Sequence, residues 1–295
     1  MSIYLKLNIC LILTIFQSEE VLPFDYSFGI PMILFWIQIF LFSTILIEAR
    51  LMSRKISLVI YTITIAYAGL LLGGQSNVVN PIHQFLLTLG ENGDFEYLIP
   101  AIIIFSIVLI TSFLVGRMFC AFACPVGTLQ EILSRINFKN DLKNQKRTRR
   151  RIEISKQISS RIRWIFLVSF VIFAGVWSIQ LLPFVNPFSG FLILQKPEVF
   201  FVVVSFIFLV GLTISSIFLY RPYCRFICPF GAGSSLLSDY SRNKYERTND
   251  CTECGLCEEV CPTQEAYRDS KKGECYYCNR CIEICPVDAI RLNLG

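Results

Sequence analysis

Long apolar runs separated by short polar segments dominate the chain. About 17–25 apolar residues are needed to cross the hydrocarbon core of a bilayer. Runs of this length cover residues 29–47, 56–72, 98–115, 164–182 and 199–219. A sixth run, 3–16, is shorter and contains Lys6, and no small-x-small cleavage site follows it, so it is either a first span or a signal peptide. The pattern predicts a membrane α-helical bundle of five or six transmembrane helices.

Charged residues lie mainly between these runs and predict the orientation. Segments 50–55 and 117–163 are rich in Lys and Arg, whereas 73–97 contains none. Because basic loops stay in the cytoplasm, the chain after residue 219 is expected on the cytoplasmic side. These loops also account for the net charge of +5, so no nucleic-acid partner is expected. Segment 139–163 is expected to be a solvated loop, with binding of anionic lipid or an acidic partner as the alternative.

A sequence pattern, RxxCxxxCPxG, occurs twice with one fixed offset. The first copy contains Arg117, Cys120, Cys124, Pro125 and Gly127, and the second contains Arg221, Cys224, Cys228, Pro229 and Gly231. Each copy follows an apolar run that is itself preceded by Val-Asn-Pro, at 79–81 and 185–187. We expect two parallel repeats related by a pseudo-twofold axis along the membrane normal. Such an axis would bring both cysteine pairs together at the cytoplasmic boundary.

The C-terminal cysteines follow a spacing that is typical of iron–sulfur ligands. Twelve of the 13 cysteines form four tight groups and only Cys10 stands alone, which favours ligation over disulfides. The tail repeats C-x2-C-x2-C-x3-C-P, the bacterial two-cluster ferredoxin pattern, in which the fourth cysteine of each run ligates the other cluster. Structural zinc is the alternative, but it uses paired C-x2-C halves. We therefore expect one [4Fe–4S] cluster on Cys251, Cys254, Cys257 and Cys285, and a second on Cys275, Cys278, Cys281 and Cys261.

The repeated C-x3-C-P pairs are less specific. Thiols four residues apart share one face of a helix. Brought together, Cys120, Cys124, Cys224 and Cys228 could hold an additional iron–sulfur or metal centre. Alternatively, they are packed small residues or reversible dithiols. Arg117, Arg221 and Arg225 either lower the thiolate pKa and offset cluster charge, or extend to the membrane interface as snorkelling residues.

Three polar residues of the outer loops are weaker candidates. His83 is the only histidine, which excludes a haem with two histidine ligands from this chain. It could bind or protonate quinone, although an interfacial histidine without a ligand is the simpler interpretation. Asn80 and Asn186, at matching positions of the repeats, either cap the turn before proline or contact a ligand.

The two RxxCxxxCPxG segments followed by the double ferredoxin run resemble the NapH/NosR family of polytopic membrane ferredoxins. MauN and the oxidase-assembly protein CcoG are related through the same motifs, and the resemblance covers residues 56–295. It implies an integral protein of the prokaryotic cytoplasmic membrane with clusters facing the cytoplasm. The chain lacks the large flavin-bearing periplasmic domain of NosR, so it resembles the shorter NapH or MauN form.

Three functions are compatible with these features. The first is electron transfer between cytoplasmic clusters and the quinone pool or a periplasmic partner, as a quinol dehydrogenase component of a redox complex. The second is a CcoG-like copper or iron reductase or assembly factor, and the third is a membrane anchor or redox sensor. Three domains are expected: an N-terminal membrane region (1–55), a transmembrane core (56–240) and a C-terminal α+β two-cluster ferredoxin domain (241–295).

Overall fold

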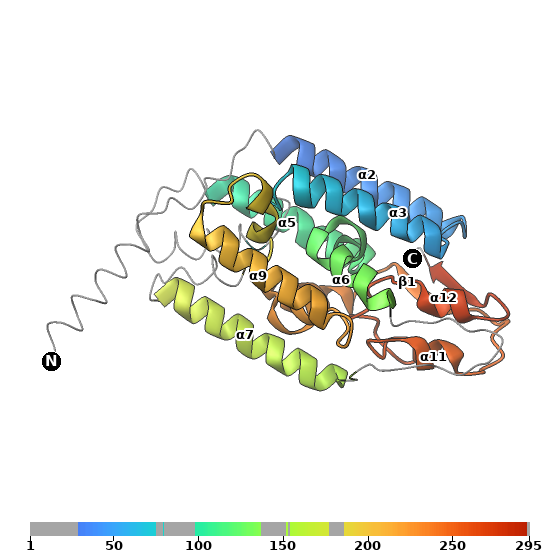
Figure 1. Cartoon of the computed structure of the whole chain (residues 1–295). Coiled ribbons are helices and arrows are strands. Elements are labelled where there is room, and N and C mark those ends of the chain that lie inside the picture. Colours follow the sequence, from blue (N-terminus) through green and yellow to red (C-terminus); the bar gives the residue numbers. More distant parts are fainter. Residues whose placement is uncertain are drawn as a thin grey trace, which may run out of the picture.

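The computed structural model describes residues 29–74, 79, 98–136, 152, 154–176 and 186–293. The predictions for 3–16, Asn80, His83 and most of segment 139–163 lie outside these residues. Five long helical segments run along the molecule: α2 (Gly29–Glu48), α3 (Arg54–Thr64) with its continuation η2 (Ile65–Leu71), α5 (Leu98–Val115), α7 (Lys156–Val176) and α9 (Phe200–Ser215). Figure 1 shows them lying along one another, with the C-terminal elements at one end. The described residues are thus mostly helical.

Two of these segments are long and apolar enough to cross a membrane. They cover Pro31–Glu48 and Arg54–Leu71, and shorter apolar helices cover Ser106–Val115 and Phe200–Ser215. Large apolar side chains are exposed along them, including Leu41 on α2, Val59 on α3 and Ile207 on α9. An apolar surface of this extent indicates contact with lipid or another protein. The larger span count expected from the sequence stays a prediction.

Helix α7 begins earlier than the sequence pattern predicts. The apolar run begins at residue 164, but the helix starts at Lys156 and includes Arg161 and Arg163. The expectation of a solvated loop is therefore wrong for residues 156–163. Arg163 is fully buried, because it pairs with Glu274 in the C-terminal domain at 2.8 Å (Nη2 to Oε1). A basic residue that looked like part of a loop is in fact part of a domain contact.

The two RxxCxxxCPxG segments fold in the same way. After α5 the chain forms a wide turn, η4 (Phe119–Ala123), and then α6 (Pro125–Ile136). After α9 it forms η6 (Tyr223–Ile227) and then α10 (Pro229–Ser238). Cys124 and Cys228 each have extended backbone, and the following proline occupies the first helical position, where its missing N–H costs nothing. The repeated sequence therefore encodes a repeated helix–turn–helix.

The C-terminal region is a small α+β unit at the end of the bundle. Strand β1 (Lys244–Arg247) pairs antiparallel with β2 (Ile290–Asn293), with Lys244 opposite Asn293 and Arg247 opposite Ile290. Two five-residue helices, α11 (Leu256–Val260) and α12 (Arg280–Ile284), lie between the strands in sequence. Each is preceded by a left-handed residue, Gly255 (φ 74°) or Asn279 (φ 61°), which turns the chain between the second and third cysteines of its run.

Candidate metal centres

The cysteines of the C-terminal runs line two cavities. Four thiols line the first, which we call the inner cavity: Cys261, Cys275, Cys278 and Cys281. Four others line the second, the outer cavity: Cys251, Cys254, Cys257 and Cys285. In each cavity the fourth thiol comes from the other run, which is the grouping that the ferredoxin spacing predicts. None of these cysteines forms a disulfide.

The repeated C-x3-C-P pairs line a third cavity, which we call the motif cavity. Its thiols are Cys120, Cys124, Cys224 and Cys228, so each of the wide turns η4 and η6 and its following residue supply one pair. All four are buried and none is in a disulfide. Phe119, Tyr223 and Phe230 complete the wall and exclude water. The structure thus brings together two pairs that lie about a hundred residues apart.

The repeated glycines explain how each turn approaches its helix. A Cβ on Gly127 would lie 2.5 Å from the Cys120 carbonyl oxygen, and one on Gly231 would lie 2.8 Å from the Cys224 carbonyl oxygen. Neither contact is sterically possible. Glycine is therefore required at this position of the repeat, because α6 and α10 pack directly on the backbone of the turn that carries the cysteine.

The repeated arginines connect the two copies. Arg117 of the first copy donates from Nη2 to the Gly231 carbonyl of the second copy at 2.7 Å. Arg221 of the second copy donates from Nη1 to the Cys120 carbonyl of the first at 2.6 Å. Both side chains are fully buried, which excludes the snorkelling interpretation for these two residues. Arg225 is also buried. It donates to the Ile154 carbonyl at 3.0 Å and to Ser159 Oγ at 3.2 Å, and the second bond connects the second copy to α7.

Buried positive charge exceeds buried negative charge around the three cavities. Among the described residues six arginines are buried but only three glutamates: Arg117, Arg135, Arg163, Arg221, Arg225 and Arg280 against Glu131, Glu265 and Glu274. Arg117 Nε, Arg221 Nη2 and Arg163 Nη1 are buried donors without a hydrogen-bond acceptor in the protein. Buried charges are costly unless they are compensated. Anionic groups ligated by thiolates in the cavities would supply the missing negative charge.

The donor type of the four-thiol sets fits iron–sulfur clusters. Each set consists of thiols, and thiolates are the ligands of such clusters. The buried positive charge around the sets also suits an anionic cluster. In the parts of the chain that the structure describes, no group of three or more His, Cys, Asp or Glu side chains forms a single-ion site.

Glu131 is the centre of the largest ionic network. Its carboxylate accepts from Arg280 at 2.7 Å, Arg221 at 3.1 Å and Arg135 at 3.3 Å, and Tyr220 donates its hydroxyl at 2.8 Å. Burial raises its pKa, but Arg280, Arg221 and Arg135 overcome this and lower the pKa of Glu131 to about 2. The network joins α6 to the ferredoxin helix α12, since Arg280 is the first residue of α12.

The net shift in pKa is in the opposite direction for the motif thiol Cys224, because burial outweighs the arginines there. Burial raises the pKa of Cys224 to about 12, although Arg221 and Arg117 pull the value down. The neighbouring arginines do lower the thiol pKa, as expected. Burial raises it by more than they lower it, so the net pKa is above the ordinary value. Ligation of a metal would displace these protons.

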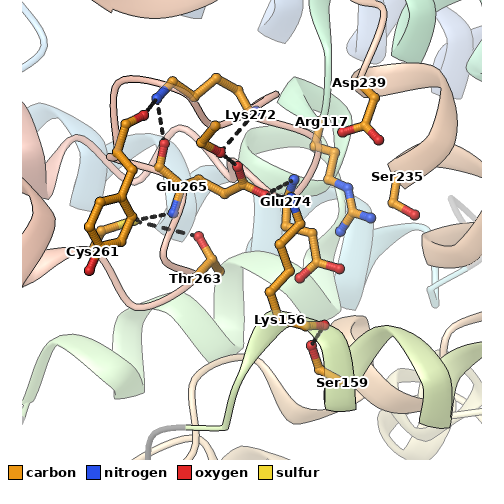
Figure 2. Close-up of polar contacts among 12 residues, drawn as sticks. Arg117, Lys156, Ser159, Ser235, Asp239, Cys261, Thr263, Glu265, Lys272 and Glu274 are labelled. Atoms are coloured by element: carbon orange, nitrogen blue, oxygen red, sulfur yellow. Dashed lines mark hydrogen bonds and ion pairs between the residues drawn. The ribbon is translucent and has the colours of Figure 1, made fainter.

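Contacts of Glu265 hold the loop that carries Cys261 in place. Glu265 accepts an ion pair from Lys156 of α7 at 2.6 Å and the backbone N–H of Glu274 at 3.0 Å. The Glu265 N–H in turn donates to Cys261 Sγ at 3.2 Å (Figure 2). Cys285 accepts the equivalent bond from the Ala289 N–H at 3.2 Å. Cys261 and Cys285, the fourth cysteines of their runs, thus each accept the backbone N–H of the residue four positions later. Hydrogen bonds to the ligating sulfur tune the reduction potential of a cluster.

Several of these residues could not be identified from the sequence. In the sequence, Glu131, Arg163 and Glu274 look like ordinary surface charges, and Tyr276 is one of two residues between the ligand candidates Cys275 and Cys278. Asn186, which was a candidate ligand, accepts the Phe188 N–H at 3.2 Å and so caps the turn before η5 (Ser189–Leu194).

Comparison with known proteins also indicates binding of iron–sulfur clusters. A 4Fe–4S binding domain matches residues 97–143 and 201–247, each with one C-x3-C-P pair, and a second 4Fe–4S binding domain matches 245–264. No solved structure matches the chain.

Three of the most similar curated proteins extend this result. The chain is 27% identical to the uncharacterised protein MJ0750 of Methanocaldococcus jannaschii, over 62% of this chain and 71% of that protein. It is 27% identical to YccM of Escherichia coli, assigned to electron transport, over 53% of this chain and 44% of YccM. It is 26% identical to the methylamine utilization ferredoxin-type protein MauN of Paracoccus denitrificans, over 54% and 53%. The chain thus spans about half of YccM and MauN. Together with a match to NosR, these relationships show that the chain is similar to ferredoxin-type 4Fe–4S proteins such as NosR and MauN.

Proposed function

We propose that this chain is an integral-membrane electron-transfer protein. It passes electrons between the quinone pool, or a membrane or periplasmic partner, and [4Fe–4S] clusters on the cytoplasmic side, as a subunit of a redox complex. The observation that carries the proposal is the motif cavity: four buried thiols lie where the apolar helices α5 and α9 end, next to the ferredoxin domain.

We assign the cluster ligands from the three thiol sets. The outer cavity holds one [4Fe–4S] cluster on Cys251, Cys254, Cys257 and Cys285, and the inner cavity holds one on Cys261, Cys275, Cys278 and Cys281. The motif cavity holds a third centre on Cys120, Cys124, Cys224 and Cys228. Each cluster supplies one-electron redox chemistry when bound.

The third centre shortens the distance that electrons must cross between the membrane and the C-terminal clusters. The hydrocarbon core is roughly 30 Å thick, so clusters confined to a cytoplasmic domain cannot exchange electrons directly with the opposite face. A centre at the ends of α5 and α9 lies at the boundary, where a quinol dissolved in the bilayer can approach it.

The protein's own residues prepare this site for electron transfer. Phe119, Phe230 and Tyr223 exclude water from the thiols. Arg117 lines the same cavity, and Arg221 donates to the Cys120 carbonyl, so both place positive charge near the thiols. Buried positive charge stabilises the more negative, reduced state of a cluster and so raises its reduction potential. The arginines therefore favour acceptance of electrons from a donor such as quinol.

Quinol-dependent reduction tests the proposal. Anaerobically purified protein is mixed with a reduced short-chain quinol, and the cluster EPR signals are followed. Wild type is expected to be reduced, whereas a variant with Cys120, Cys124, Cys224 and Cys228 replaced by serine is reduced by dithionite but not by quinol. No quinol-dependent signal in wild type would contradict the proposal. Reoxidation of reduced clusters by cupric ion, without any response to quinol, would instead support a metal reductase.

A further inference from the structure

The three thiol-lined cavities lie in a row. The inner and outer cavities share Arg247 and Ile290 in their walls. The inner and motif cavities share Tyr276, and the motif and outer cavities have no lining residue in common. The inner cavity is therefore in the middle, between the motif cavity and the outer cavity.

Tyr276 connects two thiol sets by a short route. It directly follows Cys275 of the inner cavity in the sequence. Its hydroxyl reaches the other set, because it donates to the carbonyl of Cys224 in the motif cavity at 3.5 Å. One residue thus joins a thiol of each cavity through covalent bonds and a single long hydrogen bond.

The ring of Tyr276 is held rigidly in this position. The guanidinium carbons of Arg117 and Arg221 lie 4.9 and 4.8 Å from its centroid. Arg117 also donates to its hydroxyl, and the ring of Tyr220 packs edge-on at 6.0 Å. Cations at this distance from an aromatic face are attracted to it. The two arginines that connect the RxxCxxxCPxG copies therefore also fix the tyrosine between the cavities.

We infer that Tyr276 is the electron bridge between the motif centre and the inner cluster, and that electrons pass in the order motif, inner, outer or in reverse. The inference rests on the proposed function, because it requires a third centre. In each step one centre loses one electron and the next gains it. Tyr276 supplies the path and keeps its own oxidation state and its proton, so no covalent bond forms or breaks.

Time-resolved reduction from the exposed end tests this inference. Cys254 of the outer cavity is exposed, so a photoreduced deazaflavin in solution donates one electron there first. Rapid freeze-quench EPR then follows the signals of the three centres. In wild type the motif signal is expected last. In Tyr276→Leu it should appear several-fold more slowly, with an intermediate rate in Tyr276→Phe, which keeps the ring but loses the contact with Cys224.

Two controls separate a bridging role from a structural one. Tyr240→Leu alters a tyrosine that is 72% exposed and lines none of the three cavities, and it should leave the rate unchanged. The reduction potentials and the fully reduced spectrum of Tyr276→Leu are measured in parallel, because Arg117 donates to the hydroxyl of Tyr276 and a changed potential would itself alter the rate. Slower transfer at unchanged potentials supports the bridge, and slowing that a shift in potential fully accounts for overturns it.

The results distinguish failure of the inference from failure of the proposed function. A wild-type rate in Tyr276→Leu at full iron content would overturn the bridge. If that variant loses iron, a wild-type rate in Tyr276→Phe would overturn it. About eight irons per wild-type chain, enough for only two [4Fe–4S] clusters, would instead overturn the third centre itself.

Discussion

At the scale of single residues, the buried carboxylate of Glu131 has the most partners. It accepts from three arginines and from the hydroxyl of Tyr220, and these contacts join α6 to α12.

We expect Glu131→Gln to destabilise the protein. The change leaves the buried Arg221, Arg280 and Arg135 without their common carboxylate. Removing one partner of a buried ion pair costs about 3–5 kcal/mol. Denaturant unfolding of the detergent-purified protein, followed by cluster absorbance, measures the loss. The matched control is Glu253→Gln, because the Glu253–Arg268 pair is 70% and 61% exposed and should contribute almost nothing. Equal effects of the two substitutions would contradict the role of Glu131.

The same residue predicts how stability depends on pH. The pKa of Glu131 is lowered from 4.5 in the ordinary case to about 2 in the folded protein. Its contribution is therefore fully present above pH 4.5 and is lost as pH falls towards 2. We expect the free energy of unfolding of wild type to fall more steeply over this window than that of Glu131→Gln. Parallel curves for the two proteins would contradict the prediction.

Cysteine spacing was more informative about single residues than charge was. The two C-x2-C-x2-C-x3-C-P runs pointed to the thiols that line the inner and outer cavities. The roles of Arg117 and Arg221 stayed open, because a buried arginine and a snorkelling one have the same sequence context. Glu131 was missed, because burial of a charged side chain depends on which segments meet in space, and its neighbours in sequence do not reveal this.

At the scale of elements, the repeat was the most informative feature of the sequence. Equal spacing of arginine, cysteine, proline and glycine predicted two equivalent units, and η4–α6 and η6–α10 have the same form. The proximity of their cysteines was expected from the pseudo-symmetry. The wide turns themselves were not expected, nor was the start of α7 at Lys156, because an apolar run locates the middle of a helix better than its ends.

The repeated glycines give a prediction at this scale. Gly127→Ala would place a Cβ 2.5 Å from the Cys120 carbonyl oxygen and force α6 away from the turn. Overpacking of this kind costs about 1–3 kcal/mol. We expect lower stability together with loss of iron from the motif centre but not from the ferredoxin domain, measured by unfolding and by EPR. Gly211→Ala in α9 is the matched control, because nothing lies within 4 Å of its added Cβ. Full iron content in Gly127→Ala would contradict the packing argument.

At the scale of the whole molecule, the ferredoxin domain and the helical bundle form one structure. Arg163 of α7 pairs with Glu274, Arg135 of α6 contacts the Cys278 carbonyl at 2.6 Å, and Lys156 pairs with Glu265. The amino-acid composition changes near residue 241, but it does not show that the C-terminal domain packs against buried arginines of the helical bundle. The position of the domain depends on contacts between residues more than a hundred positions apart, and no local pattern contains that information.

The depth of the three cavities predicts the order in which their clusters are damaged. Cys254 in the outer cavity is exposed, the inner cavity's thiols are partly buried, and those of the motif cavity are buried. Under limiting ferricyanide we expect the outer signal to be lost first and the motif signal last, as followed by EPR and iron release. Loss of the motif signal before the outer one would contradict the arrangement of the three centres.

The central claim is that four thiols at the ends of α5 and α9 hold a third centre next to a two-cluster ferredoxin domain. Iron and acid-labile sulfide, quantified together with EPR spectra on anaerobically purified protein, test it most directly. The matched variant replaces Cys120, Cys124, Cys224 and Cys228 by serine. We predict more than about eight irons in wild type and about eight in the variant, the content of two [4Fe–4S] clusters. About eight irons in both proteins would contradict the claim and confine the cofactors to the C-terminal domain.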